Sequence, residues 1–249
     1  MSVISQYVEI KSARMGRREM NKIIGFVPAR GGSTRIPCKN MREIDGMPLF
    51  LRACYHLHQV LSKECIVVDS DDENILQIAK EHGFSAIKRP DELASNATDG
   101  NSFFRWETSN YPDADIYIQH LPPMPFLSKE TLEKCLTALE KEDYDSVVCV
   151  GKEHFYLWDE EKGEPLYDLK HIPNSYTLPE TVFETMGLYV IRREAHLKNG
   201  LRIGEKYKMI ALNKFEQIDI NYPDDYELAT AVARGLPNNS VYIIRERIS

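Results

Sequence analysis

A loop rich in glycine and cationic residues is the part of the sequence best suited to chemistry. It covers residues 28–40, directly after the apolar stretch at residues 23–27, and contains two adjacent glycines together with Arg30, Arg35 and Lys39. Adjacent glycines let consecutive backbone N–H groups turn toward one anion, and the cations add fixed positive charge around it. We therefore interpret the loop as a polyphosphate site; the alternative is a basic surface turn. It has neither the GK[ST] of a Walker A loop nor the GxGxxG of a dinucleotide-binding turn.

The elements that position this loop alternate between strand and helix. Apolar β-branched stretches predict strands at residues 23–27, 65–69, 86–89, 115–120, 146–150, 186–191 and 215–220. Helical spacing predicts helices at residues 49–61, 73–82, 128–139 and 224–234, with another beginning at Thr98 or Asp99, and Gly83 and Gly235 are expected to end two of them. This alternation predicts an α/β fold with a doubly wound, mostly parallel open sheet, in which ligands bind at the carboxyl ends of the strands.

The chain is expected to form a single domain over residues 22–249. Residues 1–21 are polar and basic and contain Met15 and Met20, either of which could be the true start, so we predict a flexible extension there. Over residues 151–182 the alternation stops and aromatic residues are interleaved with charged and turn residues. Such a stretch suits an insertion that forms a subunit interface; a flap packed on its own domain fits equally well.

The composition excludes several functions. The 249 residues carry a net charge of -7, the wrong sign for a protein that neutralises nucleic acid. The five cysteines are widely spaced, with no CxxC pair, and are expected to be reduced and mostly buried. No apolar run approaches the roughly 18 residues of a membrane helix, and no secretory signal is evident. We expect a soluble, cytoplasmic protein without a membrane or nucleic-acid partner.

Four motifs lie along most of the chain after Lys22. They are PARGGSTRIPCKN at residues 28–40, VVDSDD at 67–72, RPDELA at 89–94 and IDINYPDD at 218–225. In this order they resemble the motifs of the CMP-sialic acid synthetases, which activate acidic sugars with CTP. The first is also similar to the loop of the CMP-Kdo synthetases. The chain thus looks like a CMP-sugar cytidylyltransferase, which implies a Rossmann-like nucleotide-diphospho-sugar transferase fold with a small insertion.

The resemblance implies a nucleotidyltransferase for glycan biosynthesis, with residues 151–182 as the dimerisation element of a homodimer. CMP would pass from CTP to the anomeric hydroxyl of an acidic 2-keto sugar, sialic or another nonulosonic acid, with pyrophosphate leaving and Mg²⁺ required. Charge grows on the leaving phosphates, so catalysis needs fixed cations and a metal more than a nucleophile. The implied catalytic residues are Arg30, Lys39 and Asp219. The implied nucleotide-binding residues are Ala29, Arg30, Gly31, Gly32, Ser33, Thr34, Arg35, Lys39, Asn40 and Arg89.

The implied metal ligands are Asp219 and Asn221. Asp219 is expected at the end of an apolar strand, and Mg²⁺ takes one or two carboxylates plus substrate phosphates. The family presents a second carboxylate two residues later, where this chain has Asn221, so we expect weaker metal binding. Asp224 and Asp225 are expected to cap the final helix instead.

Several positions leave alternatives open. Arg89 either contacts the nucleotide or forms a buried ion pair with Asp91 or Glu92. The chain reads LPPMPFL at residues 121–127, where the family has LQPTSPLR. A sugar carboxylate needs a charge-assisted partner, so Leu127 in place of arginine predicts an unusual acceptor if it lines the site. The alternatives are a nucleotidyltransferase with a Kdo-like or other acceptor, and a non-catalytic nucleotide-binding homologue. His120 is expected to be structural rather than to contact substrate.

Overall fold

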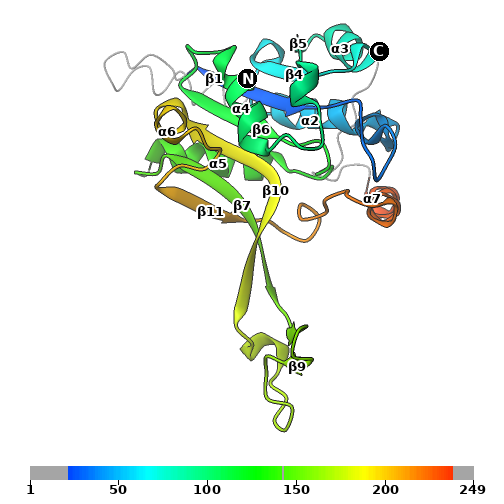
Figure 1. Cartoon of the computed structure of the whole chain (residues 1–249), viewed down its shortest axis with the longest axis vertical. Helices are drawn as coiled ribbons and strands as arrows, with labels where there is room; N and C mark the ends of the chain where they lie inside the picture. Colours follow the sequence, from blue (N-terminus) through cyan, green and yellow to red (C-terminus); the bar gives the residue numbers. More distant parts are fainter. Residues whose placement is uncertain (1–21, 142, 238–249) are drawn as a thin grey trace.

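The computed structural model describes residues 22–141 and 143–237, so the extension predicted at residues 1–21 lies outside the described residues. A seven-stranded sheet of order β11-β7-β10-β6-β1-β4-β5 forms its centre (Figure 1). The strands are β1 (Ile23–Pro28), β4 (Ile66–Ser70), β5 (Ser85–Lys88), β6 (Ile116–His120), β7 (Ser146–His154), β10 (Glu180–Arg192) and β11 (Tyr207–Ala211). All neighbours pair in parallel except β10, which is antiparallel to β6 and β7. The predicted mostly parallel α/β sheet is confirmed.

Helices cover both faces of this sheet. They are α2 (Leu49–His58), α3 (Glu73–Glu81), α4 (Gly100–Ser109), α5 (Lys129–Lys141), α6 (Arg193–Asn199) and α7 (Pro223–Gly235). The largest apolar cluster packs α2, α3 and α5 against one face, and a second cluster packs α4 and α6 against the other. The described residues also form two short hairpins, β2 (Glu43–Ile44) with β3 (Met47–Pro48) and β8 (Trp158–Asp159) with β9 (Glu164–Pro165). They contain four 3₁₀ turns, η1 (Lys39–Met41), η2 (Lys63–Cys65), η3 (Asp91–Leu93) and η4 (Ser175–Thr177).

Local sequence signals explain most helix ends. Asp72 and Asp99 accept hydrogen bonds from backbone N–H groups in the first turns of α3 and α4, and Ser128 does the same for α5. Gly83 follows α3 with a φ of 80°, as predicted for a left-handed stop. Gly235 does not act in this way, because it is the last residue of α7 and the chain continues extended.

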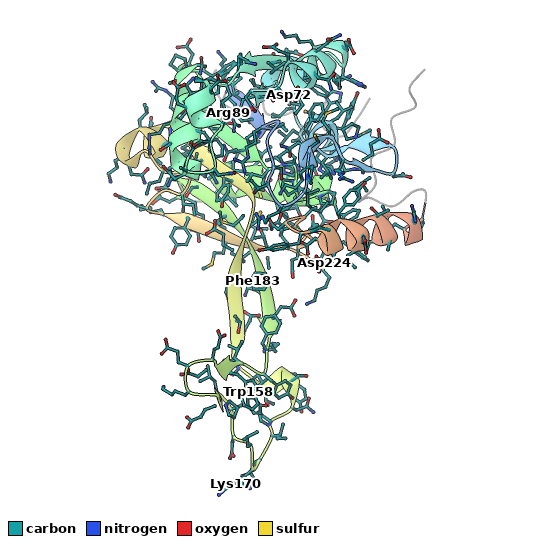
Figure 2. The ribbon with its side chains drawn as sticks, turned by 45° about the vertical axis from the view of Figure 1, so that its right-hand side comes forward. Asp72, Arg89, Trp158, Lys170, Phe183 and Asp224 are labelled. Atoms are coloured by element: carbon teal, nitrogen blue, oxygen red, sulfur yellow. The ribbon has the colours of Figure 1, made fainter. Side chains whose placement is uncertain are left out.

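A two-stranded arm projects from the sheet where β7 and β10 continue past their neighbours (Figure 1). Pairing runs from Val150 with Glu184 outward to His154 with Glu180, and the segment predicted as an insertion forms the tip. Figure 2 shows Phe183 along the arm with Trp158 and Lys170 farther out, away from Arg89 and Asp72. The stretch therefore does not pack on its own domain as a flap.

One strand prediction near the C-terminus is wrong, and one strand was not predicted. Residues 215–220 form a turn followed by irregular chain, and in the turn Asn213 and Glu216 bond to each other and to nearby backbone N–H groups. The strand β11 lies just before, where alternating exposure on the edge of the sheet gives only a weak apolar signal. No helix among the described residues is long and apolar enough to cross a membrane.

Candidate functional site

The glycine-rich loop leaves β1 at the carboxyl edge of the sheet and is tied to the end of β4. The Ala29 N–H donates to the carbonyl oxygen of Asp69 at 2.9 Å, and the Ser70 hydroxyl donates to the carbonyl oxygen of Ala29 at 2.6 Å. The Gly31 N–H donates to the Asp71 carboxylate at 2.8 Å. The loop is thus held at the edge where an open α/β sheet binds its ligands.

The two glycines of the loop have different surroundings. A Cβ atom at Gly31 would lie 2.9 Å from the Asp72 side chain, so this position needs glycine for close approach to the start of α3. A Cβ atom at Gly32 would meet nothing within 4 Å. Gly32 and Thr34 are exposed and Ser33 is half-buried, so this part of the loop faces open space.

Lys39 joins the loop to a distant segment of the chain. Its ammonium donates to the carbonyl oxygen of Ile220 at 2.8 Å. Burial lowers the pKa of Lys39, while the neighbouring Asp219 carboxylate raises it. Asn40 is buried and donates to the carbonyl oxygen of Arg30 at 2.9 Å, which fixes the backbone from which the Arg30 side chain extends. The fold therefore brings Arg30, Lys39 and Asp219 into one region.

Asp219 and Asn221 interact with each other. Asn221 donates from its amide nitrogen to the Asp219 carboxylate at 2.5 Å, while its amide oxygen accepts from Arg35 at 3.2 Å. Burial raises the pKa of Asp219, and the bond from Asn221 and the charge of Lys39 lower it. Asp219 lies in irregular chain that follows a turn at residues 214–217, and not at the end of a strand as predicted.

The acidic residues after Asn221 serve the last helix, as predicted. The Asp225 carboxylate accepts from the N–H groups of Asn221 and Tyr222 at 2.8 and 2.7 Å, and Asp224 lies in the first turn of α7. Arg35 stacks on the Tyr222 ring at 4.9 Å from its centroid. These contacts hold residues 219–222 against the glycine-rich loop.

Arg89 is buried behind the loop instead of projecting from it. Its guanidinium forms a bidentate ion pair with Asp69, with Nε 3.2 Å from one carboxylate oxygen. The predicted alternative of an ion pair was right in kind, but the partner is Asp69 rather than Asp91 or Glu92. Burial, and then the neighbouring Asp69 carboxylate, raise the pKa of Glu107 well above its usual value.

The segment 121–127 does not line an acceptor site with its apolar side chains. Met124, Phe126 and Leu127 are buried in the apolar clusters under the sheet. Leu127 is thus a core residue, so the condition under which it would change the acceptor is not met. His120 is buried and bonded to His56 Nδ1 at 3.0 Å and to the carbonyl oxygen of Gly187 at 3.2 Å, which makes it structural.

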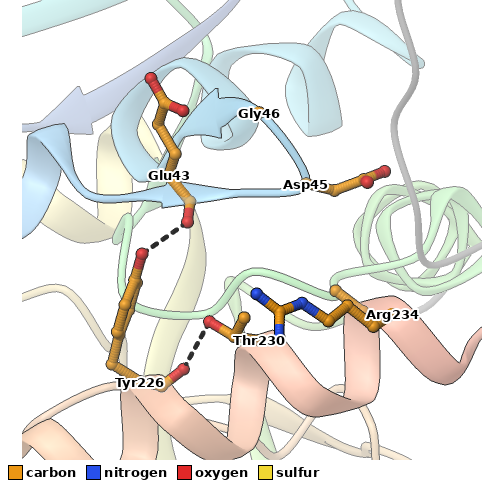
Figure 3. A pocket seen from close by; sticks show the side chains of 7 residues that line it. Glu43, Asp45, Gly46, Tyr226, Thr230 and Arg234 are labelled. Carbon is orange, nitrogen blue, oxygen red and sulfur yellow. Dashed lines mark hydrogen bonds between the residues drawn. The ribbon is translucent and has the colours of Figure 1, made fainter.

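Cys38 lies in the glycine-rich loop next to Lys39, whereas the other four cysteines and a cavity beside α7 lie outside the loop. All five cysteines are unpaired, and three of them are buried. A cavity of about 310 Å³ separates the β2–β3 hairpin from α7 (Figure 3). The Tyr226 hydroxyl donates to the Glu43 carbonyl oxygen across it, and none of the predicted site residues lines it.

The acidic groups that support the loop were missed by the sequence reasoning. Asp69, Asp71 and Asp72 fall in the motif VVDSDD, which was recognised without any role for these side chains. The structure shows one bonded to Arg89, one to Gly31 and one capping α3. The signal was available, since three carboxylates at and just after the end of a buried strand lie at the same sheet edge as the cationic loop.

Taken together, the geometry is that of a polyanion site. The loop carries Arg30, Arg35 and Lys39 and has open space at Gly32, and the Asp219 carboxylate lies beside Lys39. No group of three or more His, Cys, Asp or Glu side chains suited to a metal occurs among the described residues. Any metal here would need oxygen ligands from a bound phosphate.

Comparison with known proteins agrees with this geometry. Residues 24–221 match the family model described as cytidylyltransferase. N-acylneuraminate cytidylyltransferase A of Danio rerio is 26% identical over 223 residues, which cover 86% of this chain and 51% of the relative. CMP-N,N'-diacetyllegionaminic acid synthase of Legionella pneumophila is 27% identical over 83% of this chain and 94% of its own length. The chain spans about half the length of the first curated relatives it matches.

Solved structures share the fold. CMP:2-keto-3-deoxy-manno-octonic acid synthetase complexed with CTP superposes with a TM-score of 0.62 at 18% identity, covering 86% of this chain and all of the other. 4-Diphosphocytidyl-2C-methyl-D-erythritol synthase of Anaerococcus prevotii superposes with a TM-score of 0.59 at 17% identity, covering 86% of this chain and 96% of the other.

Proposed function

The chain belongs to the cytidylyltransferase family, and on that premise we propose that it transfers CMP from CTP to an acidic sugar with release of pyrophosphate. The observation that carries the proposal is the position of Lys39 and Asp219. One comes from the glycine-rich loop and the other from a segment 180 residues later, yet the Lys39 ammonium is bonded to Ile220, the residue next to Asp219. A cation and a hard carboxylate next to each other beside an open loop suit a triphosphate with its counter-ion.

The residues of the chain have distinct parts in the proposed reaction. Arg30 and Lys39 bind the triphosphate, and they stabilise the negative charge that develops as the bond to the β-phosphate breaks. Backbone N–H groups of residues 32 and 33 add donors at the open part of the loop. Arg35 contributes charge from the outer side of the loop. Asn40 and Arg89 act indirectly, since Asn40 is bonded to the Arg30 backbone and Arg89 to Asp69.

Mg²⁺ is part of the proposal. Asp219 fits such an ion, because Mg²⁺ often takes one carboxylate and completes its shell with waters and substrate phosphates, where it neutralises phosphate charge. Asn221 is a poorer candidate ligand for Mg²⁺, because its amide nitrogen donates to Asp219 and its amide oxygen already accepts a hydrogen bond from Arg35. The site therefore offers one charged ligand, which agrees with the expected weak metal binding.

Among acidic sugars we favour a nonulosonic acid. The support is the legionaminic acid synthase, which this chain matches over 94% of that protein's length. We also propose a homodimer that forms through the arm, whose tip carries exposed apolar side chains such as Ile172 and Tyr176.

The test is pyrophosphate release from CTP and Mg²⁺ with sialic, legionaminic, pseudaminic and Kdo-type acids, with the nucleotide product read by mass. A CMP-sugar peak that is lost in Asp219→Ala supports the proposal and identifies the acceptor. Binding of CTP by calorimetry without product from any acid would contradict it and favour a non-catalytic nucleotide-binding protein.

A further inference from the structure

Arg202 is a buried cation without an acidic partner. Its side chain is only 7% exposed, and its guanidinium lies between two aromatic rings, 4.8 Å from the Phe103 centroid and 5.1 Å from the Tyr189 centroid. Nε donates to the carbonyl oxygen of Gly100 at 3.0 Å. Among the described residues no carboxylate forms an ion pair with it.

The first residue of α4 leaves space for this guanidinium. A Cβ atom at Gly100 would lie 2.1 Å from Arg202 Nη2, closer than any side chain can approach. The Arg202 backbone N–H also donates to the Asn101 side chain at 3.0 Å. Arg202 is therefore held against the start of α4 by its backbone, its Nε and its two stacking contacts.

The guanidinium lies toward the carboxyl edge of the sheet. Tyr189 pairs with Gln119, the residue before the end of β6, and α4 begins directly after its cap at Asp99. Just beyond Tyr189, the ladder of β10 is interrupted by a bulge that includes Met186 with a φ of 56°. The Leu121 N–H donates to the Gly187 carbonyl oxygen at this bulge. The residues that contact Arg202 thus lie near the carboxyl edge of the sheet, where an open α/β sheet binds its ligands and where the acceptor of the proposed reaction would sit.

The charged groups around Arg202 leave its charge unbalanced. Arg89 stacks on Phe103 at 4.9 Å, but its charge is matched by Asp69. The Glu184 carboxylate accepts a hydrogen bond from the hydroxyl of Tyr189, one of the two aromatic residues beside Arg202. Burying a guanidinium without a counter-ion costs desolvation free energy, and the binding of an anion beside it would offset that cost.

We propose that Arg202 binds the carboxylate of the acceptor sugar. The inference rests on the proposed function and deepens it. Arginine presents two parallel N–H donors that match a carboxylate, and stacking on Phe103 and Tyr189 fixes the plane of the fork. Arg202 would then be the charge-assisted partner of the sugar carboxylate, in place of the arginine that the family has where this chain has Leu127.

Equilibrium binding tests the assignment without requiring turnover. N-acetylneuraminic acid, Kdo and their methyl esters are titrated into the protein with an α,β-methylene analogue of CTP present, for wild type and Arg202→Lys. We expect the acid to bind wild type better than the ester, and Arg202→Lys to weaken the acid at least about tenfold while the ester and CTP bind as before. Arg105→Lys is the matched control, since Arg105 lies on α4, is exposed and bonds to the Gly200 carbonyl oxygen.

A second variant covers the case in which Arg202→Lys does not fold. Gly100→Ala keeps Arg202 but displaces its guanidinium, so it should also weaken the acid and spare the ester. Equal binding of acid and ester by wild type, or acid binding unaffected by both variants, would overturn the inference. Arg202-dependent acid binding without any CMP-sugar product would instead overturn the proposed function and leave this inference standing.

Discussion

The Lys39 ammonium donates a hydrogen bond to the Ile220 carbonyl oxygen, although the two residues are 181 positions apart in the chain. This bond closes the glycine-rich loop over residues 219–222 and holds Lys39 beside Asp219. Burial lowers the pKa of Lys39 and raises that of Asp219, and each group offsets part of the effect on the other. The pair therefore keeps a cation and an anion next to each other at the proposed triphosphate site.

Replacing Lys39 with methionine should lower kcat/KM for CTP by about 10²- to 10³-fold, because one preorganised charge is lost from the transition state. Steady-state pyrophosphate release measures this effect. Lys80→Met is the control, since Lys80 is an exposed lysine on α3. A loss of less than about threefold in Lys39→Met would rule out a catalytic role for this ammonium.

Replacing Asp219 with alanine should nearly abolish turnover and raise the Mg²⁺ concentration needed for half-maximal activity. Asn221→Asp should have the opposite effect on Mg²⁺, because it adds a second carboxylate at two-residue spacing. Activity is measured as a function of Mg²⁺ concentration for Asp219→Ala and Asn221→Asp. Asp224→Asn, which changes an acidic residue in the first turn of α7, is the control. Unchanged magnesium dependence in Asp219→Ala would refute the metal site.

Gly31→Ala should destabilise the protein by about 1 to 2 kcal/mol, because the new methyl group displaces Asp72 from its position as the cap of α3. Gly32→Ala should leave stability unchanged, since nothing lies within 4 Å of the added methyl group. Urea unfolding monitored by circular dichroism compares the two. Equal midpoints would show that the loop adapts to a side chain at residue 31.

The protein should lose stability as the pH falls below 6.5. Burial lowers the pKa of His120 to about 4 and that of His56 well below its usual value, so both rings are neutral in the folded protein. Between pH 6.5 and 4 the unfolded chain takes up protons that the folded protein does not, and His120 alone costs about 2 kcal/mol between pH 7 and 5.

Urea unfolding at pH 7 and pH 5 measures this loss. The pH dependence should become shallower in His120→Gln and stay the same in His58→Gln, because His58 is an exposed histidine on the same helix as His56. A dependence that is identical in all three proteins would show that other groups cause it.

The arm should determine the oligomeric state. Ile172→Glu is expected to convert a dimer into a monomer in sedimentation velocity, because Ile172 is 65% exposed at the tip of the arm. Leu197→Glu, which changes a 63% exposed side chain on α6, should leave the dimer intact. A wild-type monomer, or a dimer that survives Ile172→Glu, would contradict the proposed interface.

Much of the fold followed from local signals in the sequence. Buried apolar runs such as Ile66–Ser70 form strands in any doubly wound sheet, and Asp72 and Asp99 mark helix starts because their carboxylates bond to nearby N–H groups. The edge strand β11 and the turn at residues 214–217 could not be predicted in this way. Residues of β11 alternate between exposed and half-buried, so the strand has no apolar run, and Glu216 in the turn also accepts a hydrogen bond from Ser128, 88 residues away.

The candidate site likewise has features that local sequence predicts and features that depend on the tertiary structure. The sequence alone determined the cationic loop, because two adjacent glycines and three cations after a strand act within one short segment. Only the tertiary structure decided that Arg89 pairs with Asp69, that Leu127 belongs to the core and that Arg202 has no counter-ion. Each of these depends on which side chains from distant segments meet, and the spacing of residues along one chain does not contain that information.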